Sequence, residues 1–149
     1  MKVKRLSEHA VLPQKAHSGD LGYDLFCSEE ITLWPGETKL VSTGIAIQFP
    51  EGYGGFIKDR SSVATKLQLF TIAGVIDNGY IGELRVALYN GADADQSATR
   101  GQQAWRKISV GDKIAQLVLI PTVNFNVEEV DELVSADQRG TGGFGSTGT

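Results

Sequence analysis

Ala73–Asn90, with the sequence AGVIDNGYIGELRVALYN, is the stretch that decides how this chain folds. Its Asn78–Gly79 pair is a strong signal for a β-hairpin, because tight primed turns need positive φ at both central residues and Asn-Gly tolerates it. The apolar pair Val75–Ile76 precedes the turn. The residues after the turn alternate, and one face of that strand collects three apolar side chains: Leu84, Val86 and Leu88. We therefore expect a hairpin with a half-buried second strand.

Asp77 is the unusual residue of this stretch, since it lies at the lip of the turn directly after two apolar residues, with Tyr80 three positions on. One interpretation is purely structural, because aspartate side chains in turns often accept hydrogen bonds from nearby backbone amides. The other is that Asp77 is a chemical group displayed at a site. The hairpin alone favours the first interpretation, and the rest of the chain decides between them.

Composition limits the classes of protein to consider. The chain has 149 residues, 41% hydrophobic and 21% charged, which is typical of one globular domain with a real core. Its net charge of -4 argues against nucleic-acid binding through a basic face, but a phosphorylated ligand needs only a few cations. No secretory signal and no membrane-length apolar run are visible. We expect no nucleic-acid partner, no membrane partner and an intracellular location, cytoplasmic if the source is prokaryotic.

The chain as a whole reads as all-β. Its 18 glycines separate short alternating runs, a pattern typical of a barrel or sandwich. The expected strands, besides the hairpin, are Val3–Leu6, Asp24–Cys27, Ile31–Leu33, Leu40–Phe49, Phe56–Lys58, Ile114–Ile120 and a final one through Val123, Phe125 and Val127. The polar stretch Gly91–Lys107 is expected to form a long exposed loop, pinned by Trp105.

Asp59–Leu67, DRSSVATKL, lacks strand alternation and predicts a short helix with serine capping its start. Unpaired N–H groups at a helix start favour an anion, and Arg60, Ser61 and Ser62 would add a cation and two hydroxyl donors. The simpler alternative is a capped helix with a surface arginine. The segment is therefore a candidate phosphate site that needs support from elsewhere in the chain.

The C-terminal stretch 135–149, SADQRGTGGFGSTGT, is a second candidate phosphate site. Its glycines let backbone amides approach a phosphate closely, while Arg139 and Ser146 add a charge and a donor. The same composition is also typical of a flexible tail. Phe144 between glycines suits stacking on a base. Both interpretations hold if the tail is disordered when free and orders over a ligand.

Two further polar residues complete the candidate site. Gln116 interrupts an otherwise apolar strand and must find a hydrogen-bond partner there. Asp24 follows a glycine-rich loop and is placed to orient a water bound to Mg²⁺, a cation that keeps several waters and binds mainly through substrate phosphates. Together with Asp77, these features predict a nucleotide polyphosphate as ligand and water as nucleophile.

Five stretches in order resemble the motifs of the trimeric dUTP diphosphatases (dUTPases), over residues 15–148: GDLGYDL, DRSSVATK, AGVIDNGYIGEL, GDKIAQLVLIP and RGTGGFGSTG. The resemblance implies a jelly-roll-like β-barrel in residues 1–134 and a homotrimer with active sites between subunits. A flexible arm, residues 135–149, would be exchanged between subunits and close over the site. It also implies Mg²⁺-dependent cleavage of dUTP to dUMP and pyrophosphate, which limits uracil incorporation into DNA and supplies dUMP for thymidylate synthesis.

The resemblance assigns a role to each matching residue. Asp77 would activate the attacking water, Tyr80 would sit against the deoxyribose and exclude a 2′-hydroxyl, and Asp24 would contact Mg²⁺ only through water, with no direct protein ligand. Uracil would be read by the backbone of Gly74, Val75 and Ile76 and stacked by Phe144. The remaining substrate-binding residues would hold the phosphates: Arg60, Ser61, Ser62, Gln116, Arg139, Gly145 and Ser146.

The chain departs from the family pattern at three places. Gly79 stands where many members have a second aspartate, Ser62 stands where glycine is common, and the loop Gly91–Lys107 is longer than usual. Two alternative functions fit the sequence less well than hydrolysis. A dCTP deaminase, similar in fold, would need a glutamate where this chain has Ala87. A non-catalytic nucleotide sensor is disfavoured because both Asp77 and the complete tail are present.

Overall fold

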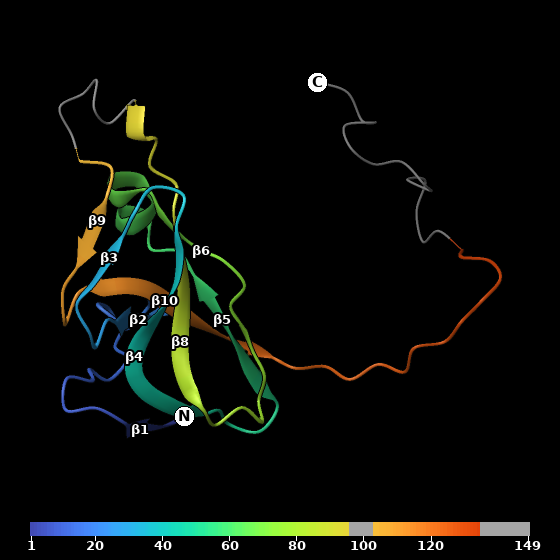
Figure 1. The fold of residues 1–149 in the computed structure, drawn as a ribbon. Coiled ribbons are helices and arrows are strands. Elements are labelled where there is room, and N and C mark those ends of the chain that lie inside the picture. Colours follow the sequence, from blue (N-terminus) through green and yellow to red (C-terminus); the bar gives the residue numbers. More distant parts are fainter. Residues whose placement is uncertain (96–102, 135–149) are drawn as a thin grey trace.

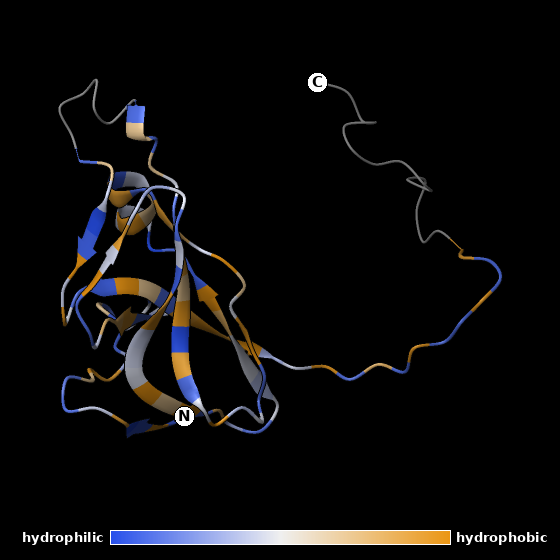
Figure 2. Cartoon of the chain, in the orientation of Figure 1, coloured by the Kyte–Doolittle hydropathy of each residue, from blue (hydrophilic) through white to orange (hydrophobic). Residues whose placement is uncertain are grey.

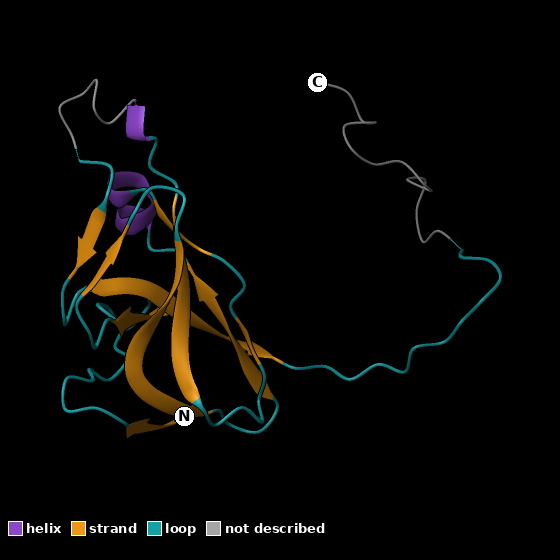
Figure 3. Ribbon diagram, viewed as in Figure 1, coloured by secondary structure: helices purple, strands orange, loops and turns teal. Residues whose placement is uncertain are grey.

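Strands make up nearly all the regular structure of residues 1–95 and 103–134, the parts of the chain that this computed structural model describes (Figures 1 and 3). One antiparallel sheet has the order β1-β4-β8-β6, with bounds Lys2–Arg5, Thr38–Gln48, Glu83–Asn90 and Leu69–Thr71. The other has the order β2-β10-β5-β7, with bounds Gly22–Phe26, Lys113–Pro121, Tyr53–Lys58 and Val75–Ile76. A third, two-stranded sheet pairs β3 (Ile31–Leu33) with β9 (Arg106–Ile108).

The core lies between the two larger sheets, and the alternation seen in the sequence produces it. In β8, buried residues alternate with partly or fully exposed ones, as predicted, and the buried side chains include Leu84, Val86 and Leu88. In β4 the predicted inward face is also buried, from Val41 to Phe49. These side chains join those of Leu25, Ile57, Ile114 and Leu117 from the opposite sheet in one cluster, and apolar residues alternate with polar ones along the strands in Figure 2. The all-β prediction is confirmed.

The predicted hairpin is wrong. β7 pairs with β5, with Gly55 opposite Ile76, whereas β8 pairs with β4 and β6 in the other sheet. The turn itself exists, because the N–H of Tyr80 donates to the carbonyl of Asp77 at 3.1 Å, but neither Asn78 nor Gly79 has positive φ. The Asn78 side chain instead donates to the carbonyls of Pro50 and Tyr53, at 2.8 and 2.6 Å. These contacts fix the turn to the β4–β5 connection, so the chain crosses between sheets there.

The predicted final strand is also wrong. Residues 122–134 form no strand and run away from the barrel (Figure 1), leaving Val123, Phe125 and Val127 at 66%, 83% and 99% exposure. The preceding strand, β10, is already paired on both sides, by β2 and β5. The chain therefore leaves the sheet without a free edge beside it, and its alternating apolar residues have no partner among the described residues.

The helix η1 (Val63–Leu67) lies where the sequence predicts one, although its turns are of the wide π type. The predicted serine cap is absent, because Ser62 makes no capping hydrogen bond through its side chain. Thr65 Oγ1 donates instead to the carbonyl of Ser61 at 2.7 Å. Gln68 ends the helix in the left-handed conformation, with φ of 55°. No helix among residues 1–95 and 103–134 has the length and apolar content needed to cross a membrane.

The predicted loop Gly91–Lys107 is shorter than expected, because Arg106 and Lys107 belong to β9. The pin at Trp105 is confirmed, since its ring lies 6.5 Å from that of Trp34 on the turn after β3. The side chain of Asn90 donates to the carbonyl of Ala104 at 2.9 Å and so joins the two ends of the loop. Both β6 and β9 escaped prediction because neither shows the apolar–polar alternation of the equally short β3.

Candidate active site

A pocket of about 530 Å³ opens between β7 and β8, and we call it the base slot. Its lining comes from three strands and the turn: Leu40, Val75, Ile76, Asp77, Tyr80, Glu83 and Arg85. β7 ends its sheet, so its outer edge faces no strand of the described chain. β8 pairs with β6 only from Leu88 to Asn90, which leaves its first half open on the same side. The slot is therefore bordered by backbone edges that can hydrogen-bond to a flat ligand.

A strained bend directs β7 toward the slot. Ala73 and Gly74 both have positive φ, 60° and 109°, and such values are unusual for a residue with a side chain. A Cβ atom on Gly74 would lie 2.8 Å from the carbonyl oxygen of Ile57. The two backbones touch here because the Ile57 N–H donates to the Gly74 carbonyl at 2.8 Å. Strain of this kind persists at functional sites, where the surrounding structure imposes it.

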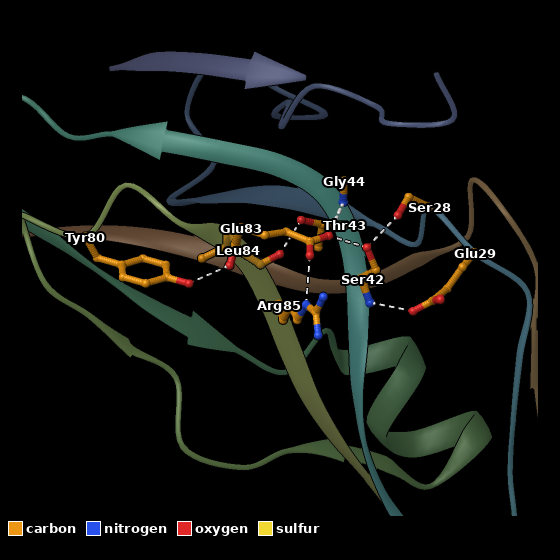
Figure 4. A network of polar contacts seen from close by, with 9 residues as sticks. All are labelled: Ser28, Glu29, Ser42, Thr43, Gly44, Tyr80, Glu83, Leu84 and Arg85. Atoms are coloured by element: carbon orange, nitrogen blue, oxygen red, sulfur yellow. Dashed lines mark hydrogen bonds and ion pairs between the residues drawn. The ribbon is translucent and has the colours of Figure 1, made fainter. Parts of the chain in front are cut away.

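The far wall of the slot is a polar network centred on Glu83 (Figure 4). Its carboxylate accepts hydrogen bonds from the Ser42 hydroxyl, from the Gly44 N–H at 3.1 Å and from Arg85 Nε at 2.8 Å. The Tyr80 hydroxyl donates to the Glu83 carbonyl at 2.9 Å, which holds the ring at the slot. Partial burial raises the pKa of Glu83, but these hydrogen bonds outweigh it and hold that pKa below its ordinary value.

A second hollow, of about 690 Å³, collects the predicted phosphate-binding residues, and we call it the phosphate cleft. Arg60, Ser61 and Ser62 line it from the start of the helix, and Gln116 lines it from β10. Gln116 has the partner predicted for it, since its amide donates to the Asp59 carbonyl at 2.8 Å. A Cβ atom on Gly22 would lie 2.2 Å from Gln116 Oε1, so the glycine makes room for this side chain.

Asp24 also lines the phosphate cleft, but its carboxylate is buried and bonded to two cations. Its Oδ1 accepts from Arg60 Nε at 2.7 Å, and its Oδ2 contacts Lys113 Nζ at 2.8 Å. The sequence singled out Asp24 and Arg60 separately and missed Lys113. Lys113 stands next to Asp112 in an ordinary turn sequence, so only the pairing of β2 with β10 reveals its role.

The structure therefore divides the predicted site residues into two groups. Asp77, Tyr80 and the β7 residues line the base slot, whereas Asp24, Gln116 and the Arg60–Ser62 segment line the phosphate cleft, and none of the described residues lines both. Glu83 and Arg85 of the slot were also missed, because alternation marks them only as outward-facing. The predicted arm residues lie outside the described part of the chain: Arg139, Phe144, Gly145 and Ser146.

The oxygen donors of the phosphate cleft bear on magnesium binding. Within residues 1–95 and 103–134, no group of three or more His, Cys, Asp or Glu side chains is placed to hold a metal. Mg²⁺ keeps several of its waters and binds mainly through substrate phosphates, and the phosphate cleft is lined by hydroxyl, amide and carboxylate oxygens that suit hydrogen bonds to such waters.

Comparison with known proteins identifies the family. The family model described as dUTPase matches residues 8–148. The deoxyuridine 5′-triphosphate nucleotidohydrolase of Clostridioides difficile is 42% identical, over 99% of this chain and 97% of that protein. The corresponding protein of Gloeothece citriformis is 43% identical, over 99% and 96%.

Solved structures agree with the sequence comparison. A dUTPase of Staphylococcus bacteriophage 80alpha in complex with dUpNHpp superposes with a TM-score of 0.89 at 32% identity, over 99% of this chain and 98% of that one. A dUTPase of phage phi11 of S. aureus, described with a structural Mg(II) ion, gives 0.79 at 35% identity, over 88% and 96%. With matches across nearly the whole sequence and the whole fold, this chain belongs to the dUTPase family.

Proposed function

We propose that this protein hydrolyses dUTP to dUMP and pyrophosphate with the assistance of Mg²⁺. The observation that carries the proposal is the placement of an exposed carboxylate, Asp77, at the mouth of a slot bordered by open strand edges and by Tyr80. Membership of the dUTPase family supports the same substrate. The reaction removes dUTP from the pool of DNA precursors and supplies dUMP for thymidylate synthesis. Because this pool lies inside the cell, we place the enzyme there.

The base slot binds deoxyuridine. The edge of a uracil ring presents a carbonyl, an N–H and a second carbonyl, and this pattern matches the alternating groups of a β-strand edge. The backbone of Gly74, Val75 and Ile76 supplies that edge. The Tyr80 ring, held by the bond from its hydroxyl to the Glu83 carbonyl, packs against the sugar where a 2′-hydroxyl would stand. The slot thus selects both the base and the deoxyribose.

Asp77 acts as the general base. Its carboxylate takes a proton from a water molecule as the water oxygen attacks the α-phosphorus. The bond from that phosphorus to the bridging oxygen breaks, and pyrophosphate leaves with the electron pair. Arg60, Ser61, Ser62 and Gln116 hold the phosphate oxygens in the phosphate cleft. Mg²⁺, when bound, neutralises charge on the phosphates and so assists departure of the leaving group.

The active enzyme is a homotrimer in which one copy's base slot meets another copy's phosphate cleft. Two features support this arrangement. Within residues 1–95 and 103–134 of one chain, the slot and the cleft share no lining residue. The outer face of the β4-β8-β6 sheet also exposes apolar side chains, with Leu40 at 62% exposure and Phe70 and Tyr89 nearby. Residues 122–134 carry the chain toward a neighbour, and the arm 135–149 then closes over that neighbour's site.

One assay separates the proposed reaction from its alternatives. Purified protein with MgCl₂ and dUTP is expected to release pyrophosphate, measured by a coupled phosphate assay. Ammonia released from dCTP would instead identify a deaminase, although this chain has Ala87 at the position on β8 where that chemistry needs a glutamate. Tight binding of dUTP without either product would identify a nucleotide sensor. Either of these two results contradicts the proposal.

A further inference from the structure

A cluster of three charges is centred on Asp24; Asp24 and Arg60 line the phosphate cleft, and Lys113 lies just outside its lining. The two oxygens of the Asp24 carboxylate are bonded to different cations, Oδ1 to Arg60 Nε at 2.7 Å and Oδ2 to Lys113 Nζ at 2.8 Å. The carboxylate is nearly enclosed, since Asp24 is only 8% exposed. A carboxylate in this position is poorly solvated and depends on its partners for compensation. The cluster as a whole carries one net positive charge.

The charged residues that line the phosphate cleft do not together favour an anion. Among the described residues, the lining contains three aspartates, Asp24 included, and two cations, Lys58 and Arg60. Asp20 is turned toward its own loop, where Oδ2 accepts from the His17 N–H at 2.9 Å. Asp59 is bonded to Thr71 of β6. Lys113 does not line the cleft and stands behind Asp24, so it adds the positive charge that the lining lacks.

The geometry of Arg60 shows why that charge matters. Arg60 donates to the Asp24 carboxylate through Nε. Among the described residues, this is the one hydrogen-bond partner of the Arg60 guanidinium. This contact orients the two terminal amino groups, which are the ones that bind phosphate as a fork. However, an arginine paired with one carboxylate forms a nearly neutral pair and attracts a phosphate only weakly. A second cation on the same carboxylate makes the cluster positive again.

We propose that Lys113 is a positioning residue that neutralises Asp24, so that Asp24 can orient Arg60 without cancelling its attraction for the triphosphate. This inference rests on the proposed function, because it concerns how that substrate is held. The Lys113 side chain is 38% exposed and its Nζ lies 5.8 Å from the centre of the Phe26 ring. Methionine keeps most of the apolar stem of lysine and removes its charge, so it is the substitution suited to this test.

The test compares binding of an imido analogue of dUTP with binding of deoxyuridine, by calorimetry on the full chain. Lys113→Met should weaken analogue binding about tenfold, the effect of losing one partly screened charge near the phosphates, with deoxyuridine unchanged. Its affinity should also depend less steeply on salt. Lys113→Arg should restore binding. Lys107→Met is the matched control, because Lys107 pairs with Glu30 at 2.8 Å outside the cleft and should leave binding unchanged.

The double variant Asp24→Asn with Lys113→Met gives the decisive comparison, made without Mg²⁺. An amide oxygen still accepts the Arg60 Nε hydrogen bond, and the cluster regains its single positive charge, so analogue affinity should recover. A double variant weaker than Lys113→Met alone overturns the proposal. So does an equal loss of deoxyuridine binding, which indicates a merely structural lysine. Tighter Mg²⁺-dependent binding by Lys113→Met also overturns it, since Lys113 would then mask Asp24 from the metal. Wild-type protein that fails to hydrolyse dUTP refutes the proposed function itself.

Discussion

Asp77 is the carboxylate on which the proposed chemistry depends. It lies exposed at the mouth of the base slot, where a water molecule can reach it. We predict that Asp77→Asn lowers kcat by about 10²–10⁴, the usual effect of losing a positioned general base. The KM for dUTP should stay within a few-fold, because the amide keeps the size of the side chain. Steady-state kinetics measure both values, and a kcat within about threefold of wild type would remove Asp77 from this role.

Glu83 gives the protein a pH dependence whose sign can be stated. Hydrogen bonds from Ser42, Arg85 and Gly44 outweigh the effect of burial and place the folded-state pKa below 4.5, the ordinary value. A lowered folded-state pKa stabilises the protein above the unfolded-state pKa, and this contribution disappears as pH falls through the folded-state value.

We therefore expect Glu83→Gln to reduce the free energy of unfolding at pH 7, with the difference from wild type shrinking as the solution is acidified below 4.5. Urea unfolding measured from pH 7 down to pH 3 provides the comparison. A difference that stays constant across this range would mean that the ionised form of Glu83 contributes no stability.

At the scale of the element, β7 depends on one glycine. Gly74 has φ of 109°, and a Cβ atom there would lie 2.8 Å from the Ile57 carbonyl oxygen. We predict that Gly74→Ala destabilises the fold by about 1–3 kcal/mol and displaces the β7 backbone from the base slot. The dissociation constant of deoxyuridine should rise, and the melting temperature in thermal unfolding should fall.

Gly79→Ala is the matched control for this prediction. Gly79 lies five residues further along, does not have positive φ, and has open space where a Cβ would stand. Its replacement should leave stability within about 1 kcal/mol of wild type. Equal effects of the two substitutions would mean that the bend at Gly74 has no special importance for the slot.

Elements whose structure depends on local pattern were predictable from the sequence. The alternation of β4 and β8 identified their buried faces because burial imposes a period of two residues. The predicted hairpin was wrong because a turn signal says nothing about competing strands, and β7 pairs with β5 rather than with β8. Residues 122–127 alternate like a strand, yet a strand needs a free edge to pair with. β10, which leads into them, is already paired with β2 and β5.

The site residues divide in the same way, into those that the sequence could predict and those whose importance depends on tertiary pairing. Gln116 stands out in the sequence because it interrupts an apolar strand, whereas the site roles expected of Asp77 and Tyr80 came from the resemblance to the dUTPase motifs. Lys113, Glu83 and Arg85 do not stand out, because surface positions of strands are commonly charged. Their importance comes from the partners that tertiary pairing gives them, Asp24 for Lys113 and the slot for the other two. No local pattern encodes such partners.

At the scale of the whole molecule, the proposed trimer makes a prediction about mixed assemblies. One variant carries Asp77→Asn with its arm intact, and the other ends at Asp137 with Asp77 intact. Each should be nearly inactive alone. When the two are refolded together, activity should reappear, because some sites then combine an intact carboxylate from one chain with an intact arm from another.

Pyrophosphate release from verified mixed trimers is the measurement, and the separately refolded variants provide the baseline. Activity that remains at this baseline would mean that each arm serves its own Asp77. The recovered level depends on the mixing ratio, so only its presence is predicted.

The separation of β7 from β8 has a further consequence for how the barrel is held together. The Asp77–Tyr80 turn carries the chain from one sheet to the other. Beside it, at the slot, β7 and β8 are not hydrogen-bonded to each other. A base hydrogen-bonded to the edge of β7 would fill the gap between β7 and β8. The bound nucleotide would then add contacts that help to hold the barrel together. β7 is only two residues long, and its amides should exchange quickly with deuterium in the free enzyme. Nucleotide binding should both slow that exchange and raise the melting temperature, since both measurements report how firmly β7 is held once the base fills the gap between β7 and β8.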